Sequence, residues 1–146
     1  MTFYDLPPDW PRRPLTEPRL VADVLDLVVT GTSRAEGALY VLLCRPDDRL
    51  AQPCAVTGVD AERVDRTHRE ILQPFAALMR DTDPGGSMLV AIARPGPLVV
   101  DDDDRAWHQA AIDVCVDGPR LLGVHVVTEA GSLPLTGVDQ AANRAS

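Results

Sequence analysis

The stretch ARPGPLVVDDDDRAWH, residues 93–108, decides how this chain folds because it joins two segments of different periodicity. Before it lies Met88–Ala93 (MLVAIA), a continuous apolar segment whose length predicts a strand in the interior of a sheet. After the aspartates, apolar residues recur at helical spacing until Gly118-Pro119. The apolar stripe of this predicted helix consists of Trp107, Ala110, Ala111, Val114 and Cys115. The stretch therefore predicts a strand, a loop and a helix in succession.

Four successive aspartates, Asp101–Asp104, stand where this helix begins. The first turn of a helix exposes unpaired N–H groups and the positive end of the peptide dipoles, so a carboxylate there stabilises it by roughly 0.3–1 kcal/mol. We expect one of the four to cap the helix. Because four like charges repel one another, they also favour a partner cation.

A metal site is the alternative interpretation of these carboxylates. Calcium loops alternate oxygen ligands with spacer residues, which consecutive aspartates do not supply, and zinc requires nearby His or Cys. His108 follows Asp104 by four positions, so the two side chains share a helix face and make two ligands at most. We therefore favour the helix start and predict no metal or other cofactor.

The remaining segments predict two hairpins and two further helices. Thr16 is the expected N-cap of a helix over Glu17–Val29. A hairpin is predicted from Ala38–Cys44 and Leu50–Thr57, and Pro53 assigns its second strand to a sheet edge or a bulge.

The helix after this hairpin is expected to start at Asp60 and to be kinked by Pro74. One face of it carries Val64, His68, Ile71, Leu72, Phe75, Leu78 and Met79. A histidine on such a face, here His68, is more often a packing residue than a ligand. Val124–Thr128 and Leu133–Leu135 predict a second hairpin. The element order is α-β-β-α-β-α-β-β, a small mixed β-sheet flanked by helices in the α/β (α+β) class.

The chain is long enough for one domain, which we assign to residues 16–136. Residues 1–15 form a proline-rich N-terminal arm that holds half of the aromatic residues, so we expect it to lie on the domain or on a second subunit. These aromatic residues are Phe3, Tyr4 and Trp10. We expect residues 137–146 to be a disordered tail.

The composition excludes several classes of protein. The net charge is −8 and the 14 basic residues are all arginine, without a stripe that follows a phosphate backbone, so we expect no nucleic-acid partner. The absence of lysine excludes P-loop and Schiff-base chemistry. No segment approaches about 18 continuous apolar residues, and no N-terminal signal is apparent. We expect a soluble cytoplasmic protein with no membrane partner, whose three cysteines are buried, reduced thiols.

Four segments form a recognisable series: Arg49–Gly58, Ile92–Gly96 (IARPG), Asp101–Asp104 and Leu121–Gly131 (LLGVHVVTEAG). In their order they resemble the RadC-like bacterial branch of the JAMM/MPN metalloprotease fold. That family has a Glu-bearing strand, an H-x-H-P-S-G loop, an S-x-x-D helix start and a closing hairpin. The likeness spans about Pro18–Leu135 and implies the JAMM/MPN fold.

The resemblance also implies that the family's chemistry is missing. The two histidine positions fall on Ile92 and Arg94 and the glutamate falls near Pro53, while Asp104 alone keeps a ligand type. The family's zinc needs two imidazoles and a carboxylate, and an arginine has no lone pair to donate. We therefore predict that Arg94 pairs with Asp101 or Asp104 and replaces the zinc electrostatically.

Three functional hypotheses follow. The first is a catalytically inactive, metal-free module that binds a protein partner or assembles, with a homodimer through the arm and a sheet edge as one arrangement. Its binding positions are Arg94, Asp101, Asp104 and His108. The second is a hydrolase with a non-standard site, whose candidate bases are His68, His108 and His125 and whose candidate nucleophile or ligand is Cys54. The third is a sensor that holds an anion or peptide on the Arg94 loop.

Overall fold

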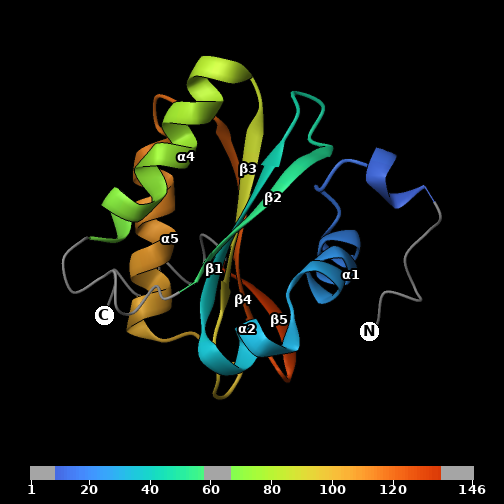
Figure 1. The fold of residues 1–146 in the computed structure, drawn as a ribbon, viewed down its shortest axis with the longest axis vertical. Coiled ribbons are helices and arrows are strands. Elements are labelled where there is room, and N and C mark those ends of the chain that lie inside the picture. The colour runs from blue at the N-terminus through green and yellow to red at the C-terminus, as the bar shows by residue number, and fades with distance from the viewer. Residues whose placement is uncertain (1–8, 58–66, 136–146) are drawn as a thin grey trace.

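The computed structural model describes residues 9–57 and 67–135, which form a five-stranded mixed sheet with helices on both faces (Figure 1). The strand order is β2-β1-β3-β4-β5, in which β3 and β4 are parallel and every other neighbouring pair is antiparallel. The strands are β1 (Ala38–Cys44), β2 (Leu50–Thr57), β3 (Ser87–Ala93), β4 (Arg120–Thr128) and β5 (Gly131–Leu135). The helices are η2 (Trp10–Arg12), α1 (Pro18–Val28), α2 (Gly31–Glu36), α4 (His68–Thr82) and α5 (Asp102–Cys115).

This architecture confirms the mixed α+β class and the placement of β3 inside the sheet. It corrects the expected element order, because the short helix α2 lies between α1 and β1. The Thr30 hydroxyl starts α2 by accepting a hydrogen bond from the Ser33 N–H at 3.1 Å. A helix of six residues is too short to show the periodicity on which sequence patterns depend.

Two expected helix starts differ from the structure. The N-cap of α1 is Glu17 rather than Thr16, and it makes no side-chain cap bond; Pro18, whose missing N–H needs no partner in the first turn, begins the helix. Helix α4 starts after Thr67, which forms a capping box with Glu70. Asp60 and Val64, which were assigned to this helix, lie outside the described residues.

The two faces of the sheet hold separate cores. Helices α4 and α5 cover one face and α1 covers the other (Figure 1). Side chains alternate between the faces along each strand, so the fully buried strands β1 and β3 supply both cores. Leu78, which was expected on the buried face of α4, is instead 48% exposed.

Proline occurs on both edge strands of the sheet. Pro53 lies on β2, as expected for an edge strand, and Pro134 lies on β5. The Val127 carbonyl accepts from the Arg94 N–H at 3.1 Å, so Val127 turns its backbone groups toward β3. The alternate residues of β5, Ser132 and Pro134, therefore turn their backbone nitrogens toward the free edge, where Pro134 offers no donor.

The described part of the N-terminal arm lies on the domain, as expected. Trp10 packs against the core on the α1 face, and Leu15 is buried. The Leu15 N–H donates to the Asp48 carbonyl at 2.9 Å. Phe3, Tyr4 and the tail 137–146 lie outside the described residues. Within the described ranges, none of the helices combines the length and the apolar character needed to cross a bilayer.

Candidate functional site

The candidate site begins where β3 ends and is completed by the first turn of α5. Asp101 is the N-cap of α5, and its Oδ1 accepts from the Asp104 N–H at 2.8 Å. Asp104 Oδ2 accepts in return from the Asp101 N–H at 3.0 Å, which completes a capping box. The prediction that one of the four aspartates caps the helix is therefore confirmed.

Arg94 follows β3 directly and forms a two-point ion pair with Asp104. Its Nε donates to Asp104 Oδ1 at 3.1 Å, and its Nη2 donates to Asp104 Oδ2 at 2.7 Å. The Asp104 side chain has no exposed surface, whereas that of Arg94 is 18% exposed. Asp101 lies farther away, with its Oδ2 3.8 Å from Arg94 Nε. The predicted pairing of Arg94 with these carboxylates is confirmed.

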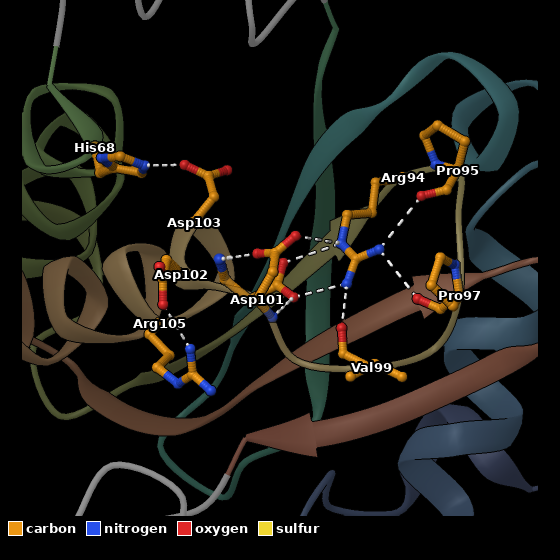
Figure 2. Close-up of polar contacts among 10 residues, drawn as sticks. His68, Arg94, Pro95, Pro97, Val99, Asp101, Asp102, Asp103 and Arg105 are labelled. Carbon is orange, nitrogen blue, oxygen red and sulfur yellow. Dashed lines mark hydrogen bonds and ion pairs between the residues drawn. The ribbon is translucent and has the colours of Figure 1, made fainter. Parts of the chain in front are cut away.

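The remaining N–H groups of Arg94 bind the loop that surrounds them (Figure 2). Nη1 donates to the carbonyls of Pro95 at 3.3 Å and Pro97 at 3.2 Å, and Nη2 donates to the carbonyl of Val99 at 2.7 Å. A guanidinium has five N–H donors, and together with the two bonds to Asp104 all five have an acceptor. We call this arrangement of Arg94, Asp104 and the three carbonyls the Arg94 clamp.

The electrostatics of the clamp keep Arg94 charged. The hydrogen bond to Asp104 raises the pKa of Arg94, and this effect outweighs burial, which acts in the opposite direction. The chain thus holds a permanent cation against a buried carboxylate. Removing either partner would leave the other as an uncompensated charge.

His68 and His108 lie on the same side of the sheet as the clamp. His68 Nε2 is 2.8 Å from Asp103 Oδ1 (Figure 2). The His68 ring also meets the Trp107 ring edge-on, with centroids 4.4 Å apart. These contacts join the first turn of α4 to the first two turns of α5, as expected for a partly buried packing histidine. His108 lies partly buried on α5, one turn after Asp104.

His125 lies on the opposite side of the sheet. As alternation predicted, it faces away from Val124 and Val126, which belong to the core under α4 and α5. Burial lowers the pKa of His125 to about 4, so its ring is neutral at pH 7. The sheet therefore separates His125 from His68 and His108, and the structure does not bring the three candidate bases together.

The thiols lack the surroundings of a nucleophile. Cys44 is buried as expected, whereas Cys54 and Cys115 are only partly buried. All three are free, and burial raises the pKa of each thiol, to about 11 for Cys44 and Cys115. A reactive cysteine needs a lowered pKa and a nearby cation or base. Cys54 packs instead against the apolar core under α4 and α5.

A second arginine–aspartate cluster, which the sequence patterns do not predict, lies at the other end of β3. Arg120 Nη2 is 2.8 Å from Asp48 Oδ1, and the Ser87 hydroxyl donates to the same oxygen at 2.7 Å. Burial acts to raise the pKa of Asp48, but the hydrogen bonds from Arg120 and Ser87 lower it overall. The one local signal was the turn RPDDR (45–49), in which Asp48 has a φ of 68°. We call this group the Asp48 cluster.

Across residues 9–57 and 67–135, no three His, Cys, Asp or Glu side chains gather closely enough to hold a metal ion. Comparison with family models, with curated proteins and with solved structures finds no match for this chain. The site therefore has to be interpreted from its own geometry, and the resemblance to the RadC-like branch stays a prediction.

Proposed function

We propose that this chain is a catalytically inactive, metal-free domain of the RadC-like JAMM/MPN type that acts as a protein-binding or assembly module in the cytoplasm. The observation that carries the proposal is the Arg94 clamp. At the position where the resemblance expects a metal-binding histidine, a guanidinium holds both oxygens of Asp104.

The clamp leaves little for a divalent ion to bind. Arg94 has no lone pair, and its positive charge repels a metal cation at the carboxylate it covers. The other expected histidine position is Ile92, a buried residue of the apolar core. These residue types support a structural role for the former site.

The same geometry weighs against the two alternatives. An anion or peptide carboxylate on the Arg94 loop would need a free N–H group, and all five are engaged. A hydrolase would need its bases to converge, whereas His125 lies across the sheet from His68 and His108. A module without chemistry of its own is the interpretation with the fewest conflicts.

A protein is the partner that best suits this surface. The net charge of −8 disfavours nucleic acid. Trp10 packs on its own domain, and Pro134 removes a donor from the β5 edge. Both observations weigh against a homodimer built on the arm and the β5 edge.

The metal-free assignment and the RadC-like resemblance are tested together by rebuilding the ligands. We expect the purified chain, equilibrated with zinc, to hold no stoichiometric metal by elemental analysis. The variant Ile92→His/Arg94→His should then bind about one zinc per chain, because it returns two imidazoles beside Asp104. Leu27→His/Val116→His, at two exposed positions outside the clamp, is the matched control and should gain no such site.

Two results would overturn this part of the proposal. Stoichiometric zinc in the natural chain would show that the clamp opens. A double variant that stays folded by circular dichroism yet binds no zinc would contradict the proposal that positions 92, 94 and 104 are arranged as in a RadC-like zinc site. If the double variant unfolds without metal, refolding it in the presence of zinc repeats the test, because zinc bound to the rebuilt site would stabilise the folded chain, and failure to recover the fold would count against the RadC-like geometry.

The assembly role is tested on the full chain by analytical ultracentrifugation and by native isolation from its host. We expect a complex of fixed stoichiometry, either with another protein or with a second copy. A chain that sediments as a monomer at every concentration and is isolated alone would contradict a binding module.

A further inference from the structure

We infer that a hollow between α1, α2 and the β4–β5 hairpin binds a small zwitterion of the size and chemistry of a free α-amino acid. The hollow measures ≈ 220 Å³. It lies on the α1 face of the sheet, and its wall residue Val127 accepts the Arg94 N–H, but it contains no side chain of the Arg94 clamp and is independent of the proposed function. Its walls are formed by Ala22, Asp26, Arg34, Val127, Gly131 and Ser132.

The cationic side of the hollow is Arg34 of α2. Its Nη1 donates to the Thr128 carbonyl at 3.2 Å, and its Nη2 donates to Asp26 Oδ1 at 3.2 Å and to the Asp26 carbonyl at 3.5 Å. These bonds use three of its five donors, so the Nε–H and one Nη1–H have no acceptor within the described ranges. The side chain is only 12% exposed, which fixes the guanidinium in place.

The anionic side is Asp26 of α1. Arg34 bonds to its Oδ1, and no bond within residues 9–57 and 67–135 involves its Oδ2. The side chain is 29% exposed, so this oxygen remains accessible to a small ligand. Asp26 and Arg34 together present one open acceptor with negative charge and two open donors with positive charge.

All five N–H groups of Arg94 are engaged, whereas Arg34 keeps two open N–H groups beside an open oxygen of Asp26. These open groups of opposite charge determine which class of ligand can bind. A simple carboxylate placed against Arg34 would lie beside the negative charge of Asp26, and a simple amine placed against Asp26 would lie beside the positive charge of Arg34. A zwitterion satisfies both, with its carboxylate on Arg34 and its ammonium on Asp26. Convergent polar groups of this kind, set against the apolar walls of Ala22 and Val127, are typical of sites that orient small molecules.

Ser132 adds a polar group at the edge of the same hollow. It lies on the α1 face of β5 opposite Val127, and its backbone N–H is directed to the free edge of the sheet. Its hydroxyl has no partner among the described residues and can donate or accept. We expect the ligand's side chain to lie toward Ser132.

The test uses the full chain with the twenty free α-amino acids up to about 10 mM, followed by ligand-observed NMR and thermal shift. We expect at least one amino acid to bind saturably and to raise the melting temperature. Ethanolamine and propionate, which each carry one of the two groups, should bind at least about tenfold more weakly.

Three variants locate the binding site. Arg34→Gln and Asp26→Asn should each weaken binding by about tenfold or more, because each removes a charge-assisted hydrogen bond. Ala22→Leu should block the hollow without removing a charge, and it keeps the test valid if the polar variants unfold. Arg13→Gln, which removes an arginine from an exposed pair with Asp9, should leave binding unchanged.

Absence of binding by all twenty amino acids would overturn the inference. Equal binding of propionate or ethanolamine would overturn the zwitterion class. Undiminished binding by a folded Ala22→Leu variant would place the ligand elsewhere. None of these results bears on zinc content, so failure here is distinguishable from failure of the proposed function.

Discussion

The two ends of the central strand β3 carry arginine–aspartate groups that differ in burial and in sequence distance. The Arg94 clamp, at the carboxyl end, joins residues ten positions apart and buries its carboxylate fully. The Asp48 cluster, at the amino end, joins residues 72 positions apart, and its Arg120 is 52% exposed. The two groups use similar side chains, but the Arg94 clamp is a buried ion pair between a loop and a helix, whereas the Asp48 cluster is a partly exposed ion pair that links turns.

The largest expected effect comes from breaking the clamp. Arg94→Met leaves the buried Asp104 carboxylate without its cation and three loop carbonyls without a donor, so we expect a loss of about 3–5 kcal/mol in the free energy of unfolding. Urea denaturation at pH 7 measures it. Arg94→Lys, which keeps the charge but cannot form the two-point pair, should lose less. A loss under about 1 kcal/mol for Arg94→Met is typical of an exposed ion pair and would contradict the stabilising role of a buried Arg94–Asp104 pair.

His125 extends the comparison of buried and exposed charged groups, because it is a buried titratable group that forms no ion pair with the residues the structure describes. Burial lowers its pKa to about 4, whereas the unfolded chain takes up this proton near the ordinary value of 6.5. Since the unfolded state binds the proton first, acid removes stability as the pH falls from 6.5 to about 4, by roughly 3 kcal/mol. Denaturation of the natural chain and of His125→Leu across this range measures the difference. Parallel pH profiles for the two proteins would show that His125 titrates normally.

A smaller effect is expected at the Asp48 cluster. Arg120→Met removes bonds to Asp48 and to the carbonyls of Pro46 and Gly85, but solvent replaces part of them. We expect a loss of about 1–2 kcal/mol at pH 7. Because the pKa of Asp48 is lowered in the folded state, the carboxylate contributes stability above its unfolded pKa of about 4 and loses it as the pH falls further. The loss in free energy of unfolding caused by Arg120→Met should therefore become smaller in acid. A loss that does not change with pH would show that the Arg120–Asp48 ion pair does not stabilise the fold.

The smallest effect concerns the helix start itself. Asp101→Ala removes the side chain that accepts the Asp104 N–H, so we expect a loss of about 1 kcal/mol. Asp102→Asn is the matched control in the same turn, because Asp102 is almost fully exposed and its contact is with Arg105. Because Asp102 is itself a carboxylate in the first turn, we expect a smaller loss from this variant, about 0.3–0.5 kcal/mol, in thermal denaturation. Equal losses from the two variants would indicate a general charge effect rather than a cap.

Sequence distance explains which parts were predictable. Strand β3, helix α5 and the pairing of Arg94 with Asp104 lie within one short segment, where periodicity and charge placement act locally. The Asp48 cluster depends on three chain segments brought together by the sheet, and the local turn signal RPDDR (45–49) does not indicate that Ser87 and Arg120 are its partners. The Asp26–Arg34 hollow likewise requires α1 to pack beside β5.

Helix starts were the weaker part of the prediction. The hydroxyl of Thr16 suits a cap, but Pro18 sets the first turn of α1 one residue later. Thr30 caps α2 although a glycine follows it, and six residues show no amphipathic period.

Burial on a helix face was also predicted imperfectly. Leu78 matched the helical spacing of α4, yet it lies at the boundary of the buried face and remains exposed.

The central claim is that Arg94 occupies the Asp104 carboxylate in place of a metal. A high-resolution crystal structure of the chain soaked in zinc, with anomalous data at the zinc edge, tests it most directly. We predict Arg94 Nη2 at hydrogen-bond distance from Asp104 Oδ2 and no anomalous peak near that carboxylate. A zinc ion bound by Asp104 and an imidazole such as that of His108, with Arg94 displaced, would contradict the account.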